Sequence, residues 1–548
     1  MKRILALTLA AAAGLAACDK SPTGPRGRVP SVGEEVQLNV NFDDNCANAV
    51  FRPGTVMAVS DRAVVVADQT NPSGGFSDQD FRDFAEAFDD VVWPTMVASF
   101  GEPTDIDENG RVVVFFTRAI NQLTPPSSTF YVNGLFFSRD LFPKKATAEL
   151  GACGSSNFSE LLYMLVPDPS RGGVFGYESV KRNTVGVMAH ETQHLVSASR
   201  RLYTVKAGEA WNEAVWLNEG LSHVAEELVF YQQSGLGPRR NLAGPSFPAG
   251  SAANTAFFAY MAPNVTRYYE WVRSPEQNSV FETDDDLATR GAAWNFLRYA
   301  ADRRAGDDAA LWKSLVDSRQ VGMANLRAAL GTDPVPLLRD WAVSVYADDA
   351  VAGVDARFTQ PSWNWRGLLQ GGLPLTVRQL AGGSASFSLD PGAASYLRFG
   401  VGAGRAELRV TSGGVAPSGA CAAVPALAVG QVHTLAPAAG QALCVDGAGD
   451  YTLVAFYGAE SEGDALPVSV AATGVQAVIP PPSPSRAPLA ARELGAEVYH
   501  EDAGVRQRLH ERQRELDALV RGGGARFSSA AAAAPDPTKL YLSVMRTR

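Results

Sequence analysis

Basic residues are too few in this chain of 548 residues to suggest a nucleic-acid partner. Lysine and arginine total 48 against 58 aspartates and glutamates, which gives a formal net charge of -10 at pH 7. Proteins that bind DNA or RNA neutralise phosphates with a basic surface, and this composition does not supply one. Hydrophobic residues make up 46% of the chain, which indicates a largely globular protein, and the length favours two or more domains.

The apolar run at the N-terminus, residues 4–17, is too short to span a bilayer as a mature helix. It follows two basic residues and ends in LAAC, which resembles a bacterial lipobox. The resemblance implies that residues 1–17 are a lipoprotein signal peptide and that Cys18 is lipidated. A plain secretory signal is the alternative. Residues 18–33, rich in Pro, Gly and Ser, would tether the protein to the bacterial cell envelope, facing the periplasm or the exterior.

Cysteine is also scarce, with five residues in the chain. Apart from Cys18, four remain, and an even number is expected where disulfides form outside the cytoplasm. Cys421 and Cys444 lie within one segment and are a natural pair, so that Cys46 and Cys153 follow by elimination. No cysteine shows C-x-x-C spacing, which disfavours a cysteine zinc site.

Histidine is rarer than in most chains, with six residues, yet two of them lie close together in VMAHETQHLV, residues 187–196. At a spacing of four, His190 and His194 share one face of a helix and can bind one metal ion. Glu191 can take a proton from a metal-bound water, which is the chemistry of H-E-x-x-H. Two buried core histidines are the alternative interpretation.

A third ligand is offered by WLNEGLSHVAEEL, residues 216–228. On a second helix Glu219, His223 and Glu226 would lie on one face. Glu219 can complete a His₂Glu site whose fourth position stays open for water, an arrangement that suits Zn²⁺ best. Either His223 or Glu226 could orient a ligand imidazole.

These two motifs resemble those of the gluzincin metallopeptidases. AHETQH, WLNEGLS and the upstream FGEPTDIDENGRVVVFF look most like the hyicolysin family of secreted peptidases. The resemblance covers about residues 75–345. It implies one Zn²⁺ per chain, held by His190, His194 and Glu219, with Glu191 as general base. The G-x-M-E-N element by which membrane aminopeptidases bind the substrate amine is absent, which favours an endopeptidase acting on proteins or peptides.

The residue that would stabilise the tetrahedral oxyanion is not identified by a motif. In the aminopeptidases a tyrosine precedes Lys-Gly on a later helix, and Ala288 stands at that position here. The candidates are Arg290, Tyr260, Tyr268, Tyr269 and His223. A catalytically inactive, peptidase-like surface binding protein is therefore the alternative function, and it predicts zinc binding without turnover. No G-x-S-x-G element supports a serine hydrolase.

A calcium site is possible but is not favoured by the sequence. Asp105, Asp107 and Asn109 with Gly110 match the first half of a calcium-binding loop. The twelfth position is Phe116, where a bidentate glutamate is needed. The pattern therefore favours a tight turn over Ca²⁺.

The order of patterns predicts an α+β protein. Residues 34–355 should form a zincin-like metallopeptidase domain with a β-rich N-terminal part and a helical C-terminal part. Residues 360–475 contain short alternating runs between Gly-rich turns, which predict an all-β sandwich. Residues 476–548 are predicted to be a Pro-rich linker and a helical or partly disordered tail.

A carbohydrate-binding or adhesive role of the sandwich is a third hypothesis. The segment resembles the C-terminal accessory domains of secreted bacterial peptidases. Its aromatic residues are more typical of a core than of a ligand groove: Tyr396, Phe399, Tyr451, Phe456 and Tyr457.

Overall fold

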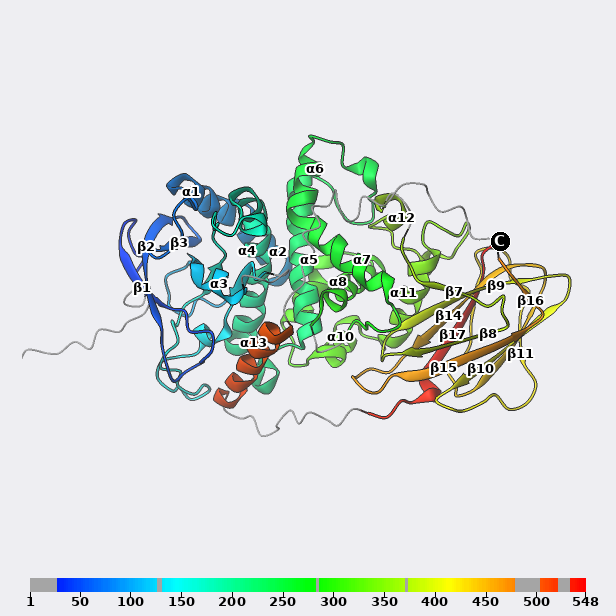
Figure 1. Cartoon of the computed structure of the whole chain (residues 1–548). Coiled ribbons are helices and arrows are strands. Elements are labelled where there is room, and N and C mark those ends of the chain that lie inside the picture. Colours follow the sequence, from blue (N-terminus) through cyan, green and yellow to red (C-terminus); the bar gives the residue numbers. More distant parts are fainter. Residues whose placement is uncertain (1–26, 126–130, 282–284, 370–372, 479–502, 521–532) are drawn as a thin grey trace, which may run out of the picture.

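The computed structural model describes six stretches of the chain: residues 27–125, 131–281, 285–369, 373–478, 503–520 and 533–548. The predicted signal peptide, Cys18 and most of the tether lie outside these residues. Figure 1 shows a small α/β part, a helical middle and a β-sandwich, arranged in that order along the molecule. None of the described helices is both long and apolar enough to cross a membrane.

The first part is built on a six-stranded mixed sheet with the order β1-β2-β3-β4-β6-β5. Strands β3, β4 and β6 run parallel, whereas β5 is antiparallel to β6 and forms the edge. The valine-rich runs of β3 and β4 are buried, as expected for strands that are covered on both faces. The strands are β1 (Glu35–Asn39), β2 (Phe51–Val59), β3 (Ala63–Asp68), β4 (Val112–Phe116), β5 (Gly134–Phe136) and β6 (Leu161–Met164).

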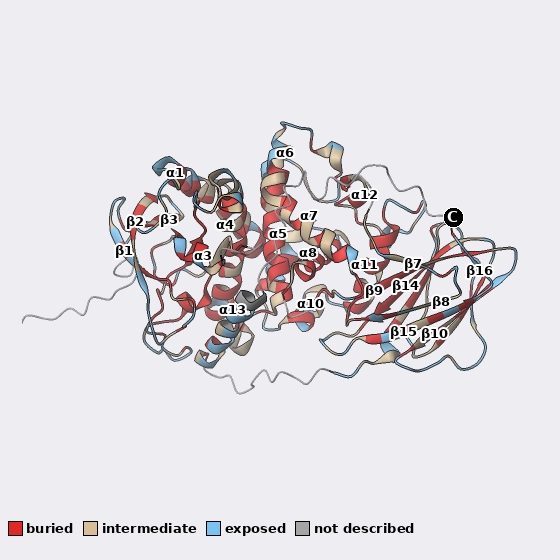
Figure 2. Cartoon of the chain, in the orientation of Figure 1, coloured by how far each residue is buried: buried red, intermediate tan, exposed pale blue. Residues whose placement is uncertain are grey.

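Helices pack on this sheet and then form the middle of the molecule. They are α1 (Asp78–Ala87), α2 (Trp93–Phe100), α3 (Arg118–Leu123), α4 (Tyr177–Ser199), α5 (Val215–Ser234), α6 (Ala252–Ala256), α7 (Ala262–Arg273), α8 (Leu287–Asp302), α9 (Asp308–Val316), α10 (Gly322–Leu330), α11 (Val335–Ala347) and α12 (Trp365–Leu368). Figure 2 shows that α4 and α5 are buried along most of their length. These two helices therefore lie at the centre of the protein rather than on its surface.

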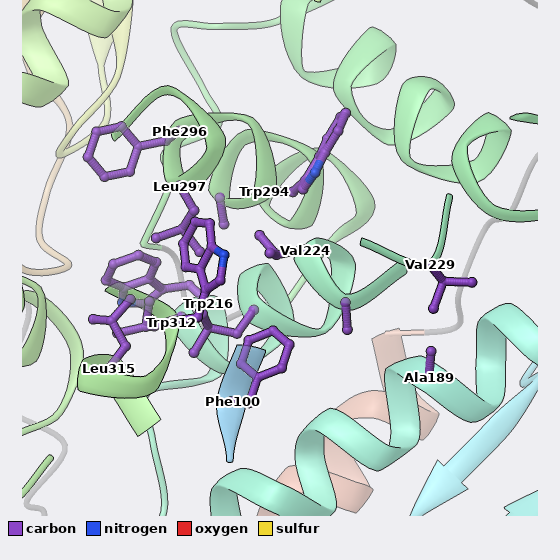
Figure 3. Close-up of a cluster of buried hydrophobic side chains, with 14 of the residues drawn as sticks. Phe100, Ala189, Trp216, Val224, Val229, Trp294, Phe296, Leu297, Trp312 and Leu315 are labelled. Carbon is purple, nitrogen blue, oxygen red and sulfur yellow. The ribbon is translucent and has the colours of Figure 1, made fainter. Parts of the chain in front are cut away.

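Large apolar side chains hold α2, α4, α5, α8 and α9 together (Figure 3). Trp216 of α5 lies among Trp312 and Leu315 of α9, and Trp294 and Leu297 come from α8. Gly220 lets α8 approach closely, because a Cβ at this position would lie 2.8 Å from Leu297 Cδ1. The close approach brings the start of α8 beside Glu219.

The C-terminal part is a sandwich of two sheets, with the orders β11-β13-β10-β15-β8 and β12-β17-β14-β9-β16. Its strands are β7 (Val377–Gln379), β8 (Ser384–Leu389), β9 (Ala394–Val401), β10 (Arg405–Ser412), β11 (Ala422–Val424), β12 (Val432–Thr434), β13 (Gln441–Asp446), β14 (Gly449–Tyr457), β15 (Leu466–Thr473), β16 (Val475–Gln476) and β17 (Leu540–Arg546). The five aromatic residues named above are all buried, so none of them lines a surface groove.

The sandwich is joined to the helical part by a packed interface. Tyr396 on β9 donates a hydrogen bond from its hydroxyl to the Ala342 carbonyl of α11 at 2.9 Å. The Glu276 carboxylate accepts from Arg378 at 2.5 and 2.8 Å. Tyr396 and Phe456 belong to the same buried cluster as the helices. The structure is thus mixed α and β, compatible with a protease domain followed by a β domain.

The segment after residue 476 differs from a simple tail. Helix α13 (Ala503–Glu515) and the short helix η9 (Leu516–Leu519) lie against the first part of the protein, where the Asn45 side chain donates to the Arg512 carbonyl at 2.7 Å. The Trp211 indole, in the segment between α4 and α5, donates to Asp517 at 2.9 Å. The chain then returns to the sandwich, where β17 lies between β12 and β14. The predicted boundary of the sandwich at residue 475 is therefore wrong, since it leaves out β17. The strand was missed because its partners β12 and β14 lie far away in the sequence.

Both predicted disulfides are present. Cys46 bonds Cys153 at a sequence separation of 107, and Cys421 bonds Cys444 at a separation of 23. The first ties the loop after β1 to the segment before β6, and the second lies within the sandwich.

Candidate metal centre

The site lies where the middle of α4 meets the first half of α5. Helix α4 carries His190, Glu191 and His194, and α5 carries Glu219. The side chains of His190, His194 and Glu219 are 10–11% exposed, so they are nearly enclosed but remain in contact with solvent. Polar groups buried to this degree need partners, and a cluster of this composition points to a bound ligand.

The two imidazoles and both oxygens of the Glu219 carboxylate converge at separations that suit a shared metal ion. His190 Nε2 lies 3.2 Å from His194 Nε2 and 3.4 Å from Glu219 Oε2. His194 Nε2 lies 3.5 Å from Glu219 Oε1. A tetrahedral ion with bonds of about 2.0–2.1 Å separates its ligand atoms by about 3.3 Å. Glu219 Oε2 is engaged by His190 and Arg290 at 3.4 and 3.3 Å, and the observed separations fit a cation that the three side chains would share.

Glu226 of α5 holds Nδ1 of His190, the ring nitrogen that faces away from Glu219 and His194. His190 Nδ1 lies 2.8 Å from Glu226 Oε1, and the same oxygen lies 3.2 Å from His223 Nδ1. The contact leaves His190 Nε2 facing Glu219 and His194. A carboxylate on the outer nitrogen fixes the ring orientation and makes the imidazole a better ligand.

His223 is fully buried behind His190, at a distance of 4.8 Å between ring centroids. Its Nε2 has no hydrogen-bond partner among the described residues. His190, Glu219 and His223 also offer ligand atoms within 4.8 Å of one another. His194 Nε2 lies 3.2 Å from His190 Nε2 and 3.5 Å from Glu219 Oε1, and these short separations make His194 the better third ligand. Burial lowers the pKa of His223 to about 3, so its ring is neutral.

His194 is oriented by α5 as well. Ser222 Oγ lies 3.1 Å from His194 Nδ1 and also donates to Gln193 Oε1 at 2.8 Å. Burial lowers the pKa of His194 to about 4, which leaves the ring neutral and its Nε2 able to bind a cation.

Glu191 points toward the edge strand of the sheet rather than toward α5. Its Oε2 accepts a hydrogen bond from the backbone N–H of Phe136 on β5 at 2.8 Å. Gly134 makes this approach possible, since a Cβ there would lie 2.5 Å from Val187 Cγ1 and 3.2 Å from Glu191 Oε1. The carboxylate is thus fixed beside the ligand cluster without belonging to it.

The ionisation of the cluster is set by burial and by neighbouring charges. Burial raises the pKa of Glu191 to about 7, although His190 opposes the rise. Burial would lower the pKa of His190, but hydrogen bonds to Glu219 and Glu226 raise it to about 10. Burial also acts against ionised Glu219, yet Arg290 and the imidazoles keep its pKa well below the usual range. The ionised carboxylates give the site the negative charge that attracts a divalent cation.

Arg290, at the start of α8, is engaged by two carboxylates. It donates to Asp285 through Nε and Nη2 at 2.7 and 2.6 Å, and its Nη1 lies 3.3 Å from Glu219 Oε2. The guanidinium is therefore beside the ligand cluster and contacts it through Glu219.

The tyrosines proposed from the sequence occupy different surroundings. Tyr268 is buried in the core, with its ring 5.7 Å from Trp271 and 4.4 Å from Trp365. Tyr269 carries Arg273 over its ring. Tyr260, on the short helix η7 (Phe257–Met261), lies against α4. A Cβ at Gly186, one turn before His190, would be 3.2 Å from the Tyr260 ring, so Tyr260 packs on the face of α4 that carries His190.

Several partners of the site were not found from the sequence. Asp285 and Phe136 come from segments that carry no motif, and Gly134 is one of 51 glycines. Only Ser222 left a signal, since it shares the helical face of Glu219 at a spacing of three.

No family model matches the chain. Among curated proteins the chain is similar to the neutral metalloprotease ShpI of Staphylococcus hyicus, with 28% identity over 152 residues. The match covers 28% of this chain and 31% of the relative, less than a third of either. The similarity supports a relationship to metallopeptidases at a coarse level.

Proposed function

We propose that the protein is a zinc-dependent endopeptidase of the gluzincin type, with a zincin-like domain over residues 34–355. The observation that carries the proposal is the convergence of His190 Nε2, His194 Nε2 and the two oxygens of the Glu219 carboxylate, with separations of 3.2–3.5 Å between neighbours and Glu191 alongside. The similarity to a neutral metalloprotease supports it independently.

Bound zinc would polarise the scissile carbonyl and lower the pKa of a water molecule. The chain's own residues do the rest. Glu191, anchored by the Phe136 N–H, accepts the proton of the attacking water and delivers it to the leaving amine. Glu226 and Ser222 hold the two imidazoles in their orientations. Arg290 is already paired with Asp285 and Glu219, so we assign it the positioning of Glu219 instead of the oxyanion role expected from the sequence.

Strand β5 offers a place for the substrate backbone. It is the edge of its sheet, and the Phe136 N–H that holds Glu191 belongs to it. An extended peptide that adds to this edge would pass directly beside Glu191 and the zinc ligands, since main-chain pairing to an edge strand is a common mode of peptide recognition. This geometry supports cleavage within a chain, because it makes no use of a terminal amine.

The natural substrates would be extracytoplasmic proteins, reached from a membrane to which lipidated Cys18 anchors the enzyme. This part of the proposal rests on the sequence of residues 1–33 alone.

Cleavage of casein tests the function, with a soluble form that lacks residues 1–18. The wild type, the wild type with a zinc chelator, and Glu191→Gln are compared at equal concentration. Glu178→Gln, a change at an exposed glutamate in the first turn of α4, is the matched control. We expect activity only in the untreated wild type and the control, with one zinc bound in Glu191→Gln.

Two results would contradict the proposal in different ways. A Glu191→Gln protein that cleaves at the wild-type rate would rule out Glu191 as the general base. A folded wild type that binds zinc and cleaves nothing would favour the alternative, a peptidase-like binding protein.

A further inference from the structure

A second group of carboxylates lies at the amino-terminal ends of strands β4 and β6. These residues precede helices α4 and α5, which carry the proposed zinc ligands. Oxygen atoms of Asp105, Asp107 and Glu160 lie within 4.8 Å of one another. The first two belong to the loop before β4, and Glu160 immediately precedes β6. The fold therefore joins the start of two neighbouring parallel strands through three acidic side chains.

Glu160 is the unusual member of the group. It is 2% exposed, its Oε1 accepts from the Ile106 N–H at 2.6 Å, and its Oε2 has no hydrogen-bond partner among the described residues. A buried carboxylate oxygen without a partner is costly, and in a native structure it points to a bound water or ion. The proximity of Asp105 and Asp107 makes a cation the better explanation, since like charges otherwise repel.

The ionisation of Glu160 agrees with this view. Burial and the charges of Asp107 and Asp105 raise its pKa well above the usual range. Burial and the neighbouring negative charges therefore disfavour the ionised form of Glu160, which a divalent ion would favour.

The loop that carries the two aspartates is already shaped around its carboxylates. Asp105 accepts from the backbone N–H groups of Asn109 and Gly110, both at 3.0 Å. Asp107 Oδ2 accepts from the Ser159 hydroxyl at 2.9 Å and from the Asn109 side-chain amide at 2.8 Å, whereas its Oδ1 accepts from the Asn109 backbone N–H at 3.2 Å. Each carboxylate oxygen has two lone pairs, so an oxygen that accepts one hydrogen bond can still bind a metal ion.

We propose that Asp105, Asp107 and Glu160 form a structural binding site for Ca²⁺. All donors are oxygen atoms, which Ca²⁺ prefers and which do not suit zinc. Three protein side chains leave room for the waters or carbonyl groups that complete six to eight ligands. Mg²⁺ would demand a stricter octahedral geometry and holds its own water more tightly.

The site also explains why the sequence disfavoured calcium. Phe116 stands where a continuous loop needs its bidentate glutamate, but the fold supplies a carboxylate from Glu160 instead. Its backbone carbonyl accepts from the Val113 N–H of β4 at 2.7 Å, so the position is fixed by sheet pairing. The ion would therefore fasten the loop before β4 to the start of β6, the strand that pairs with β5.

Calcium titration of the full chain tests this inference. The protein is freed of calcium with EGTA, zinc content is confirmed as unchanged, and CaCl₂ is added while heat release and thermal unfolding are recorded. We expect one saturable event with a dissociation constant on the order of 10⁻⁴ M or lower. When the free calcium concentration is about a hundred times the dissociation constant, the midpoint temperature of thermal unfolding should rise by about 5 °C.

Three variants locate the binding. Glu160→Gln keeps the shape and removes a buried charge, so it should fold and lose saturable binding. Asp105→Asn, at an exposed position, should weaken binding at least tenfold. Glu108→Gln lies in the same loop but outside the cluster, and should bind like the wild type.

A wild type with no saturable calcium binding up to about 10 mM, beyond the range of weak extracellular sites, would overturn the inference. Unchanged binding in both Glu160→Gln and Asp105→Asn would do the same. Neither result depends on peptidase activity, so the zinc proposal stands or falls separately.

Discussion

Replacing Glu226 should loosen zinc without touching a proposed ligand. Glu226 Oε1 lies 2.8 Å from His190 Nδ1 and 3.2 Å from His223 Nδ1. A hydrogen bond to a charged group contributes about 1.5–3 kcal/mol, against about 1 kcal/mol for a neutral one. Glu226→Gln keeps the acceptor and loses the charge, so it should weaken zinc binding about five- to tenfold, equivalent to about 1–1.4 kcal/mol.

Glu226→Ala removes the acceptor as well and leaves the His190 ring without its outer partner. Loss of such a carboxylate typically lowers metal affinity about 10–100-fold, so the alanine variant should bind zinc more weakly than the glutamine variant. Glu178→Gln is again the control and should match the wild type, because Glu178 is exposed and lies in the first turn of α4, three turns before His190.

Zinc affinity is measured at pH 7 by competition with a chromophoric chelator, and thermal unfolding of the zinc-free proteins is recorded alongside. Zinc-free variants that unfold at the wild-type temperature would place the loss in the site and not in the fold. A Glu226→Ala protein that binds zinc as tightly as the wild type would refute the reasoning, since His190 would then need no partner to hold its ring.

Three further predictions concern stability and the edge strand. The Cys46–Cys153 disulfide joins residues at a sequence separation of 107, and the Cys421–Cys444 disulfide joins residues at a separation of 23, so removing the first should lower the free energy of unfolding by about 1.4 kcal/mol more than removing the second. Equal losses in urea titrations of the two double-serine variants would contradict the loop-entropy argument. Asp80 is buried, which alone would raise its pKa, but hydrogen bonds from Lys181, Ser77 and Tyr177 keep the pKa below its usual value. The stability that Asp80 contributes should therefore be present above about pH 4 and lost as the pH falls further. Asp80→Asn should lower the free energy of unfolding at pH 7 and leave it unchanged at the lowest pH at which the protein is still folded. Gly134→Ala should lower kcat/KM at least about tenfold, because the new Cβ pushes β5 away from Val187 and Glu191, whereas Gly154→Ala, whose Cβ would contact nothing within 4 Å, should leave casein cleavage unchanged.

Local spacing explains which parts of the site could be predicted. His190 and His194 share a face of α4, and Glu219, Ser222 and Glu226 share a face of α5, because three- and four-residue spacings decide what a helix presents on one side. The tertiary step that brings the two faces together was inferred from the chemistry of zinc and not from any pairing signal. In the structure the two faces do meet, with His190 Nε2 at 3.4 Å from Glu219 Oε2, while the bound metal stays a prediction.

The remaining contacts depend on long-range pairing, for which a single sequence carries little information. Phe136 reaches Glu191 because β5 is the edge strand, and Glu160 reaches Asp107 because β4 and β6 are neighbours. A short strand such as β5, with three residues, has too little periodicity to be recognised. The same limitation hid β17, whose partners lie far away in the sequence.

Strand β17 completes the sandwich from a segment that is distant in sequence from its neighbouring strands, so the sandwich should be able to form from two separate chain fragments. The strand is hydrogen-bonded on both edges, to β12 and to β14, and Leu540, Leu542 and Val544 are fully buried in the core of the sandwich. Everything that surrounds it is contributed by residues that precede it in the chain. A protein cut between residues 520 and 533 should therefore keep the strand by non-covalent pairing, and a chain that lacks the strand should accept a synthetic peptide of residues 533–548 in its slot. The domain interface would then be assembled by complementation, with the peptide's Met545 placed against the helical part.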